Sequence, residues 1–129
     1  MVLAMSISTI ISFIHGRFAI ALILFAVLLG LWGSFSLATR RQVSPSYRSA
    51  YLLMVGLTGL QGLVGIIAFA FGLRPREILH IVYGIFAFAF LPGVYVFAAR
   101  GNKSREAMLL AVSCWVVAIA YGRGIMTGA

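Results

Sequence analysis

Two histidines, His15 and His80, are the only residues of their kind in this 129-residue chain, and each lies near the start of a long apolar run. Imidazole binds iron, zinc and copper through a ring nitrogen. A carboxylate dyad inside an apolar run is excluded, because the two acidic residues, Glu77 and Glu106, fall in polar gaps. The single cysteine, Cys114, excludes a disulfide framework, a dithiol redox motif and a cysteine-based zinc site. The chemistry open to this chain therefore centres on two imidazoles.

The elements that must position these histidines are membrane spans. The sequence is 63% hydrophobic and 9% charged, whereas a soluble domain carries about 25% charged residues. A net charge of +8 can indicate nucleic-acid binding, but here the ten basic residues lie in short gaps between apolar runs and form no polar face. We therefore expect an integral membrane protein in contact with the lipid bilayer, with no nucleic-acid partner.

Four apolar runs are long enough to cross a bilayer as helices, and we expect residues 1–129 to form a single transmembrane domain. The predicted spans are approximately residues 14–38, 51–71, 78–99 and 107–123. Short connections make successive helices antiparallel neighbours, so the predicted fold is an all-α, up-down four-helix bundle. The first run has no basic residues ahead of it and is longer than the core of a signal peptide, so we expect it to stay in the mature protein.

The distribution of basic residues predicts the orientation of the bundle. Six of the ten lie in the gaps 39–49 and 100–106, and four lie toward the opposite end. The positive-inside rule then places the loops 39–49 and 100–106 in the cytoplasm and both termini outside. We expect the chain to reside in a bacterial cytoplasmic membrane.

The two histidines head the first and third predicted helices, which are diagonal partners in an up-down bundle. Their rings should therefore project from opposite walls at similar depth. This geometry suits a flat, iron-containing macrocycle ligated from both faces, which is a six-coordinate heme. Covalent c-type attachment is excluded because Cys114 is alone, so the predicted cofactor is a non-covalent, b-type heme.

Other residues near the same end fit this interpretation. Guanidinium groups pair well with carboxylates such as heme propionates, and four arginines are candidates: Arg17, Arg74, Arg76 and Arg123. The second run carries a glycine at every third position from Gly56 to Gly65, and we place Gly62 at the cofactor because a strip without side chains allows close approach. Each feature also has a plain structural interpretation, since histidines can be solvated, arginines can anchor headgroups and glycines pack helices.

A series of motifs resembles a known family. In order along the chain they are Phe13-Ile14-His15-Gly16-Arg17, Leu60-Gln61-Gly62-Leu63-Val64-Gly65, Gly72-Leu73-Arg74-Pro75 and Leu79-His80. Over roughly residues 12–84, this order resembles one half of the heme A synthase family. Members of that family consist of two fused four-helix bundles, each with paired histidines around a heme site on the outer side of the membrane. The resemblance implies a heme-holding bundle for His15 and His80.

The chain also departs from that family's pattern. The family has a glutamate three residues before its first histidine, where this chain has Ser12, and its arginine directly follows the histidine, whereas Gly16 intervenes here. The loop cysteine pair of many members is absent, and one bundle is present instead of two. Heme-modifying chemistry is therefore the less favoured implication, although a homodimer would supply a second bundle.

Two histidine ligands leave no open iron position for oxygen or a substrate. The predicted function is therefore one-electron transfer, with a membrane quinol or a larger respiratory or photosynthetic complex as the partner. We expect an electron carrier or subunit more than a stand-alone enzyme. The alternative is a heme-free accessory subunit that stabilises such a complex. A proton-coupled transporter is disfavoured, because no acidic residue falls within a predicted span.

Overall fold

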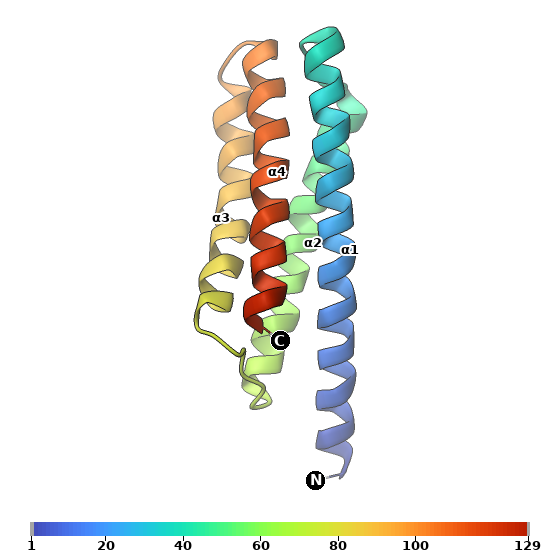
Figure 1. The fold of residues 1–129 in the computed structure, drawn as a ribbon, viewed down its shortest axis with the longest axis vertical. Helices are drawn as coiled ribbons and strands as arrows, with labels where there is room; N and C mark the ends of the chain where they lie inside the picture. Colours follow the sequence, from blue (N-terminus) through green and yellow to red (C-terminus); the bar gives the residue numbers. More distant parts are fainter. Residues whose placement is uncertain (1, 129) are drawn as a thin grey trace.

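The computed structural model describes the backbone of residues 2–128 and the side chains of residues 6–128. Four helices follow one another: α1 (Val2–Arg40), α2 (Pro45–Ala70), α3 (Leu79–Ala99) and α4 (Lys103–Gly128). They run alternately up and down, so the two ends of the chain and the loop 71–78 share one end of the bundle (Figure 1). All four are long and apolar enough to cross a membrane. The predicted all-α four-helix bundle is confirmed.

Three helices begin earlier than the predicted spans. The helix α1 begins at Val2 instead of near residue 14, and polar residues cap the early first turns of α2 and α4. The Ser44 side chain accepts a hydrogen bond from the Tyr47 backbone N–H at 3.1 Å, and Pro45 occupies the first helical position of α2. The Asn102 side chain accepts one from the Arg105 N–H at 2.8 Å at the start of α4. The predicted gaps 39–49 and 100–106 therefore contain helix as well as loop.

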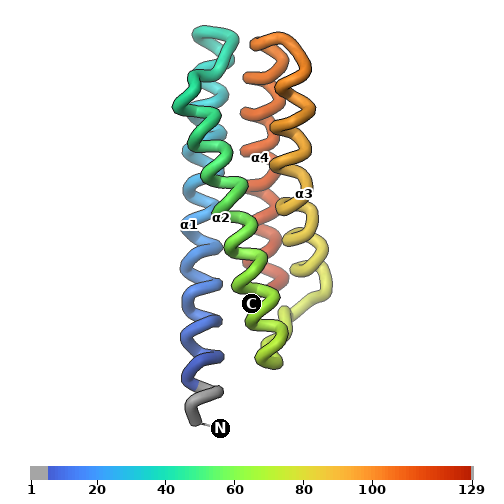
Figure 2. Tube along the Cα trace, turned by 180° about the vertical axis from the view of Figure 1, so that it is seen from behind, coloured from blue at the N-terminus to red at the C-terminus, as the bar shows by residue number. Residues whose placement is uncertain are grey.

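The helices follow one another around the bundle, so that α1 and α3 lie on one diagonal and α2 and α4 on the other. The most extensive contact joins α1 to α4, followed by α3 with α4, α1 with α2 and α2 with α3. Figure 2, seen from behind, shows α2 in front, slanting from α1 near its start toward α3 near its end. The predicted diagonal relationship of the first and third helices is therefore present.

The inner face of α2 carries hydroxyl groups that form hydrogen bonds across the bundle. Four of its buried residues recur at helical spacing: Tyr47, Tyr51, Met54 and Thr58. Tyr47 Oη donates to the Leu29 carbonyl of α1 at 3.1 Å and lies 3.4 Å from Cys114 Sγ of α4. Tyr51 Oη donates to the Leu91 carbonyl of α3 at 3.0 Å. Because an unpaired hydroxyl in hydrocarbon is costly, these bonds determine which face of α2 points inward.

One ion pair joins α2 to α4 at the end opposite the termini. Arg48 Nη2 lies 2.7 Å from Glu106 Oε1, and Arg48 Nε lies within 3.2 Å of both carboxylate oxygens. Glu106 is only 9% exposed and lies in the first turn of α4, where the helix dipole also favours a carboxylate. This residue, expected in a polar gap, thus holds two diagonal helices together.

Replacement of Glu106 by glutamine removes the charge and keeps the shape. We expect Glu106→Gln to lower the free energy of unfolding by about 1–2 kcal/mol, since hydrogen bonds to charged groups contribute roughly this much and Arg48 is partly solvated. Glu77→Gln is the matched control, because Glu77 is exposed at the other end. Denaturant titration in detergent micelles, followed by helical circular dichroism, measures both. Equal losses in the two variants would contradict a stabilising role for the pair.

Candidate functional site

His15 and His80 meet inside the bundle, at the end where the chain termini lie. Their ring centroids are 5.8 Å apart, and the ring planes make an angle of 70° in an edge-to-face contact. His15 belongs to α1 and His80 to the first turn of α3, so the contact crosses the bundle along one diagonal. Two imidazoles that each place a nitrogen about 2.0 Å from one metal ion have centroids roughly 6 Å apart. The observed spacing therefore suits two ligands of one metal.

A hydrogen bond to α4 defines the free nitrogen of His80. His80 Nδ1 lies 2.8 Å from the Gly124 carbonyl oxygen. A carbonyl can only accept, so Nδ1 carries the hydrogen and Nε2 keeps its lone pair. Metal-binding histidines are typically oriented by such a bond from the other ring nitrogen. One turn further, a Cβ at Gly128 would lie 2.6 Å from His80 Nδ1, so this close approach requires glycine.

His15 lies against the backbone of α2. Gln61 Nε2 donates to the His15 backbone oxygen at 2.8 Å, which joins α1 and α2 at this level. A Cβ at Gly65 would lie 3.3 Å from His15 Cε1 and 3.9 Å from Nε2. Among the described side chains, His15 Nδ1 and Gln61 Oε1 are buried without a hydrogen-bond partner. His15 therefore holds an unpaired polar nitrogen beside the second histidine.

The four helices contribute two kinds of residue at this level. Imidazoles come from the diagonal helices α1 and α3, while α2 and α4 offer glycine backbone at Gly65, Gly124 and Gly128. A plane between the two rings therefore has an imidazole on each face and a glycine-bearing helix at two of its edges. The two rings now make an edge-to-face contact, so a flat ligand on this plane would require them to turn a nitrogen toward each of its faces.

The loop 71–78 ties the start of α3 to the end of α4 and thereby positions His80. The Glu77 backbone N–H donates to the Thr127 carbonyl at 2.8 Å. Arg76 Nη2 donates to the Met126 carbonyl at 2.5 Å, which brings this predicted site residue next to the turn that holds His80. Arg123 belongs to the same part of α4, where it directly precedes Gly124, and its side chain is exposed.

Three other predicted site residues lie apart from the histidine rings in this structure. Arg74 stacks over the Phe69 ring at 3.7 Å and donates to the Phe69 carbonyl. Arg17 extends over Phe13 of its own helix, 5.3 Å from the ring centroid. Gly62 is exposed, and a Cβ there would meet nothing within 4 Å. The glycine of the α2 strip that contacts a histidine is Gly65.

The residues that surround the histidines include several that the sequence did not assign to the site. They are Gln61, Gly65, Gly124 and Gly128. Their spacing carries the signal, because Gln61 and Gly65 are four residues apart, as are Gly124 and Gly128, and residues four apart share a helix face. Two such pairs on diagonal helices mark the two walls between the histidines.

The described side chains alone do not complete a metal centre. Within residues 6–128 no three His, Cys, Asp or Glu side chains come together. A structural zinc ion takes four protein ligands, and the histidine pair supplies two. The pair is therefore suited to a metal that brings most of its own donors.

Comparison with known proteins finds no relative: no family model, no curated protein and no solved structure matches this chain. The function of the histidine pair must therefore be inferred from its own geometry.

Matched glycine substitutions test the contact between His15 and α2. Alanine raises helix stability over glycine by about 1 kcal/mol where the new methyl group is unhindered. We expect this gain for Gly62→Ala, because its Cβ meets open space. The gain should be smaller or reversed for Gly65→Ala, because its Cβ would press on the His15 ring. Denaturant unfolding in detergent measures both variants, and equal gains would refute the close approach.

Proposed function

We propose that this chain is a small membrane-embedded, b-type heme protein that transfers single electrons, with His15 and His80 as the axial ligands. The observation that carries this proposal is the pair of imidazoles 5.8 Å apart on diagonal helices. Heme brings four nitrogen donors of its own, completes a six-coordinate iron with two imidazoles, and supplies one-electron chemistry. It thus matches a site with two protein ligands.

The chain's own residues have distinct tasks in this proposal. The Gly124 carbonyl oxygen accepts the Nδ1–H of His80, which fixes the ring and leaves Nε2 free to bind a metal. Gly65 allows His15 to lie close to α2, and a metal bond to His15 would satisfy a ring that now carries an unpaired nitrogen. The neighbouring helices shield both rings in part from the surroundings, because each ring is partly buried.

The arginines at this end would balance the negative charge of the cofactor. Arg76 and Arg123 are the best placed, since both lie at the turn of α4 that contacts His80. Guanidinium binds carboxylates in a fork geometry and stays charged at all relevant pH values. Arg17 and Arg74 would have to leave the aromatic rings on which they now stack.

Ligation by both histidines restricts what the site does. His15 and His80 would both hold the metal and would leave no position on it for a substrate, so a bound heme would supply one-electron chemistry only. We propose a membrane quinol or a larger redox complex as the partner, and an electron carrier or subunit as the role. The residues of this chain that would touch the partner are those at the terminal end of the bundle.

An optical spectrum tests the proposal directly. Purified wild-type protein, expressed with heme supplied, should show a reduced-minus-oxidised difference spectrum of a six-coordinate b-type heme. We expect His15→Ala and His80→Ala each to lose most of the bound heme, because each removes one of two metal ligands. Val82→Ala, two residues from His80 on the same helix and exposed, is the matched control and should keep the full signal.

Two outcomes would contradict the proposal. One is a wild-type protein that is folded by circular dichroism yet binds no heme after reconstitution. The other is full heme retention in both histidine variants. Heme-free wild type that co-purifies with a large redox complex would favour the alternative role of a structural accessory subunit.

The proposed orientation places both termini outside the cytoplasm and the loops around residues 41–44 and 100–102 inside. It rests on the positive-inside rule applied to six basic residues at one end and four at the other. A C-terminal fusion to alkaline phosphatase should be active in a bacterial host, and a fusion to green fluorescent protein should be dark. The reverse pair of results would invert the orientation.

A further inference from the structure

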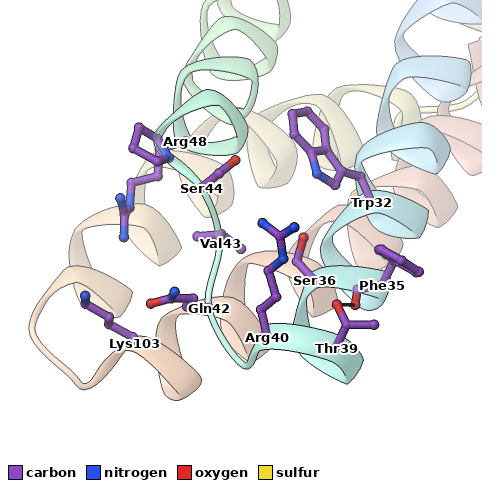
Figure 3. Close-up of a pocket in the computed structure, with 11 residues that line it drawn as sticks. Trp32, Phe35, Ser36, Thr39, Arg40, Gln42, Val43, Ser44, Arg48 and Lys103 are labelled. Carbon is purple, nitrogen blue, oxygen red and sulfur yellow. Dashed lines mark hydrogen bonds between the residues drawn. The ribbon is translucent and has the colours of Figure 1, made fainter.

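A cavity of about 490 Å³ lies at the opposite end of the bundle from the histidines, between the end of α1 and the start of α2. Three basic side chains line it, Arg40, Arg48 and Lys103, together with the aromatic rings of Trp32 and Phe35. Figure 3 shows the Arg40 side chain between α1 and the linker to α2, near Ser36, with Arg48 and Lys103 on the other side of that linker.

The chain cannot neutralise this cavity with its own carboxylate side chains. It has only two, Glu77 and Glu106. Glu106 is engaged by Arg48 in a two-pronged ion pair, and Glu77 lies at the other end of the bundle. Arg40 and Lys103 therefore have no acidic side chain within reach, and an external anion is their remaining counter-charge.

An apolar groove continues from this cavity along α1 and α2. It has a similar volume of about 490 Å³, and only apolar side chains line it, among them Leu24, Phe25 and Leu28. Trp32 lines both the cavity and the groove, so the two are adjacent. Tryptophan is typical of the membrane interface, where a polar region meets hydrocarbon. The combined surface is cationic at the interface and apolar toward the membrane interior.

We propose that the cavity and the groove together bind one anionic phospholipid. The phosphodiester lies in the cavity that Arg40 and Lys103 line, close to the positive N-terminal end of the α2 dipole, and an acyl chain lies along Leu24 and Leu28. A free phosphate would use the cationic half alone, whereas a phospholipid uses both halves.

The position of this site separates it from the histidine pair. Ser36, which lines the cavity, lies 21 positions after His15 on α1, so the two sites lie about 30 Å apart along the helix. A quinol bound in the cavity would therefore have no contact with the histidines. The lipid site does not depend on the proposed heme, and either proposal can fail without the other.

Tryptophan fluorescence reports on the proposed site. The chain has two tryptophans, so Trp115→Phe leaves Trp32 as the only one. Vesicles of phosphatidylcholine with increasing fractions of chain-brominated phosphatidylglycerol should quench Trp32 at lower brominated fractions than vesicles with brominated phosphatidylcholine. The signal can also be read as wild type minus Trp32→Phe, which keeps the test valid if Trp115→Phe does not fold.

Charge variants distinguish a site from a generally basic surface. We expect Arg40→Gln and Lys103→Gln each to weaken the relative binding of phosphatidylglycerol about five-fold, the effect of about 1 kcal/mol per basic residue near a membrane. Arg100→Gln is the matched control, because Arg100 is exposed at the same end but does not line the cavity. It should change binding less than about two-fold. Equal losses in all three variants would overturn the site.

Two further comparisons test the apolar half and the identity of the ligand. Ala21→Phe, which fills the groove, should weaken quenching several-fold, whereas Ala89→Phe on the exposed side of α3 should leave it unchanged. Excess inorganic phosphate should not displace the brominated lipid. Displacement by phosphate, or no effect of Ala21→Phe, would overturn a phospholipid as the ligand. Unchanged helical circular dichroism confirms that each variant is folded.

Discussion

Hydrogen bonds from the inner face of α2 to the other three helices govern how this bundle fits together. Four polar residues of α2 recur at helical spacing, and each forms a hydrogen bond to another helix: Tyr47, Tyr51, Thr58 and Gln61. Hydrocarbon offers these groups no water, so rotating or sliding α2 would leave several of them unpaired. The apolar residues fill the space between these bonds but would tolerate other registers, and the polar ones do not.

The need for buried polar groups to have partners is not met at the level of the histidines. Among the described side chains, the buried nitrogen and oxygen atoms that lack a partner are His15 Nδ1 and Gln61 Oε1, and both lie here. His80, by contrast, is held through one nitrogen and keeps the other available. A metal ligated by both imidazoles would pair the histidine lone pairs that the protein itself leaves without donors. At the opposite end the unpaired groups are charged. Glu106, the carboxylate at that end, already forms an ion pair with Arg48, so Arg40 and Lys103 have no carboxylate partner.

Much of the fold and the proximity of His15 to His80 followed from the sequence. Long apolar runs with short gaps were enough for the bundle, and the diagonal position of the first and third helices brought His15 and His80 together. The sequence did not indicate which glycine of α2 lies against a histidine. Residues three apart on a helix with 3.6 residues per turn drift around its axis, so a strip from Gly56 to Gly65 cannot all face one partner. Gly65 reaches His15 while Gly62 faces outward.

The arginines and Glu106 show a second limit. The sequence predicted at which end of the bundle each of these residues lies. It did not predict their contacts, because the partner of a long side chain depends on which ring, carbonyl or carboxylate the tertiary structure places within its reach. Arg17 and Arg74 lie over aromatic rings, and Arg76 donates to a carbonyl at the end of α4.

We propose above all that His15 and His80 bind one iron. Electron paramagnetic resonance of the oxidised, heme-loaded protein tests it most directly: we expect a low-spin ferric signal from the wild type, and a high-spin signal from any heme that either single histidine variant retains. A high-spin wild type, or a low-spin signal that survives either substitution, would contradict the claim.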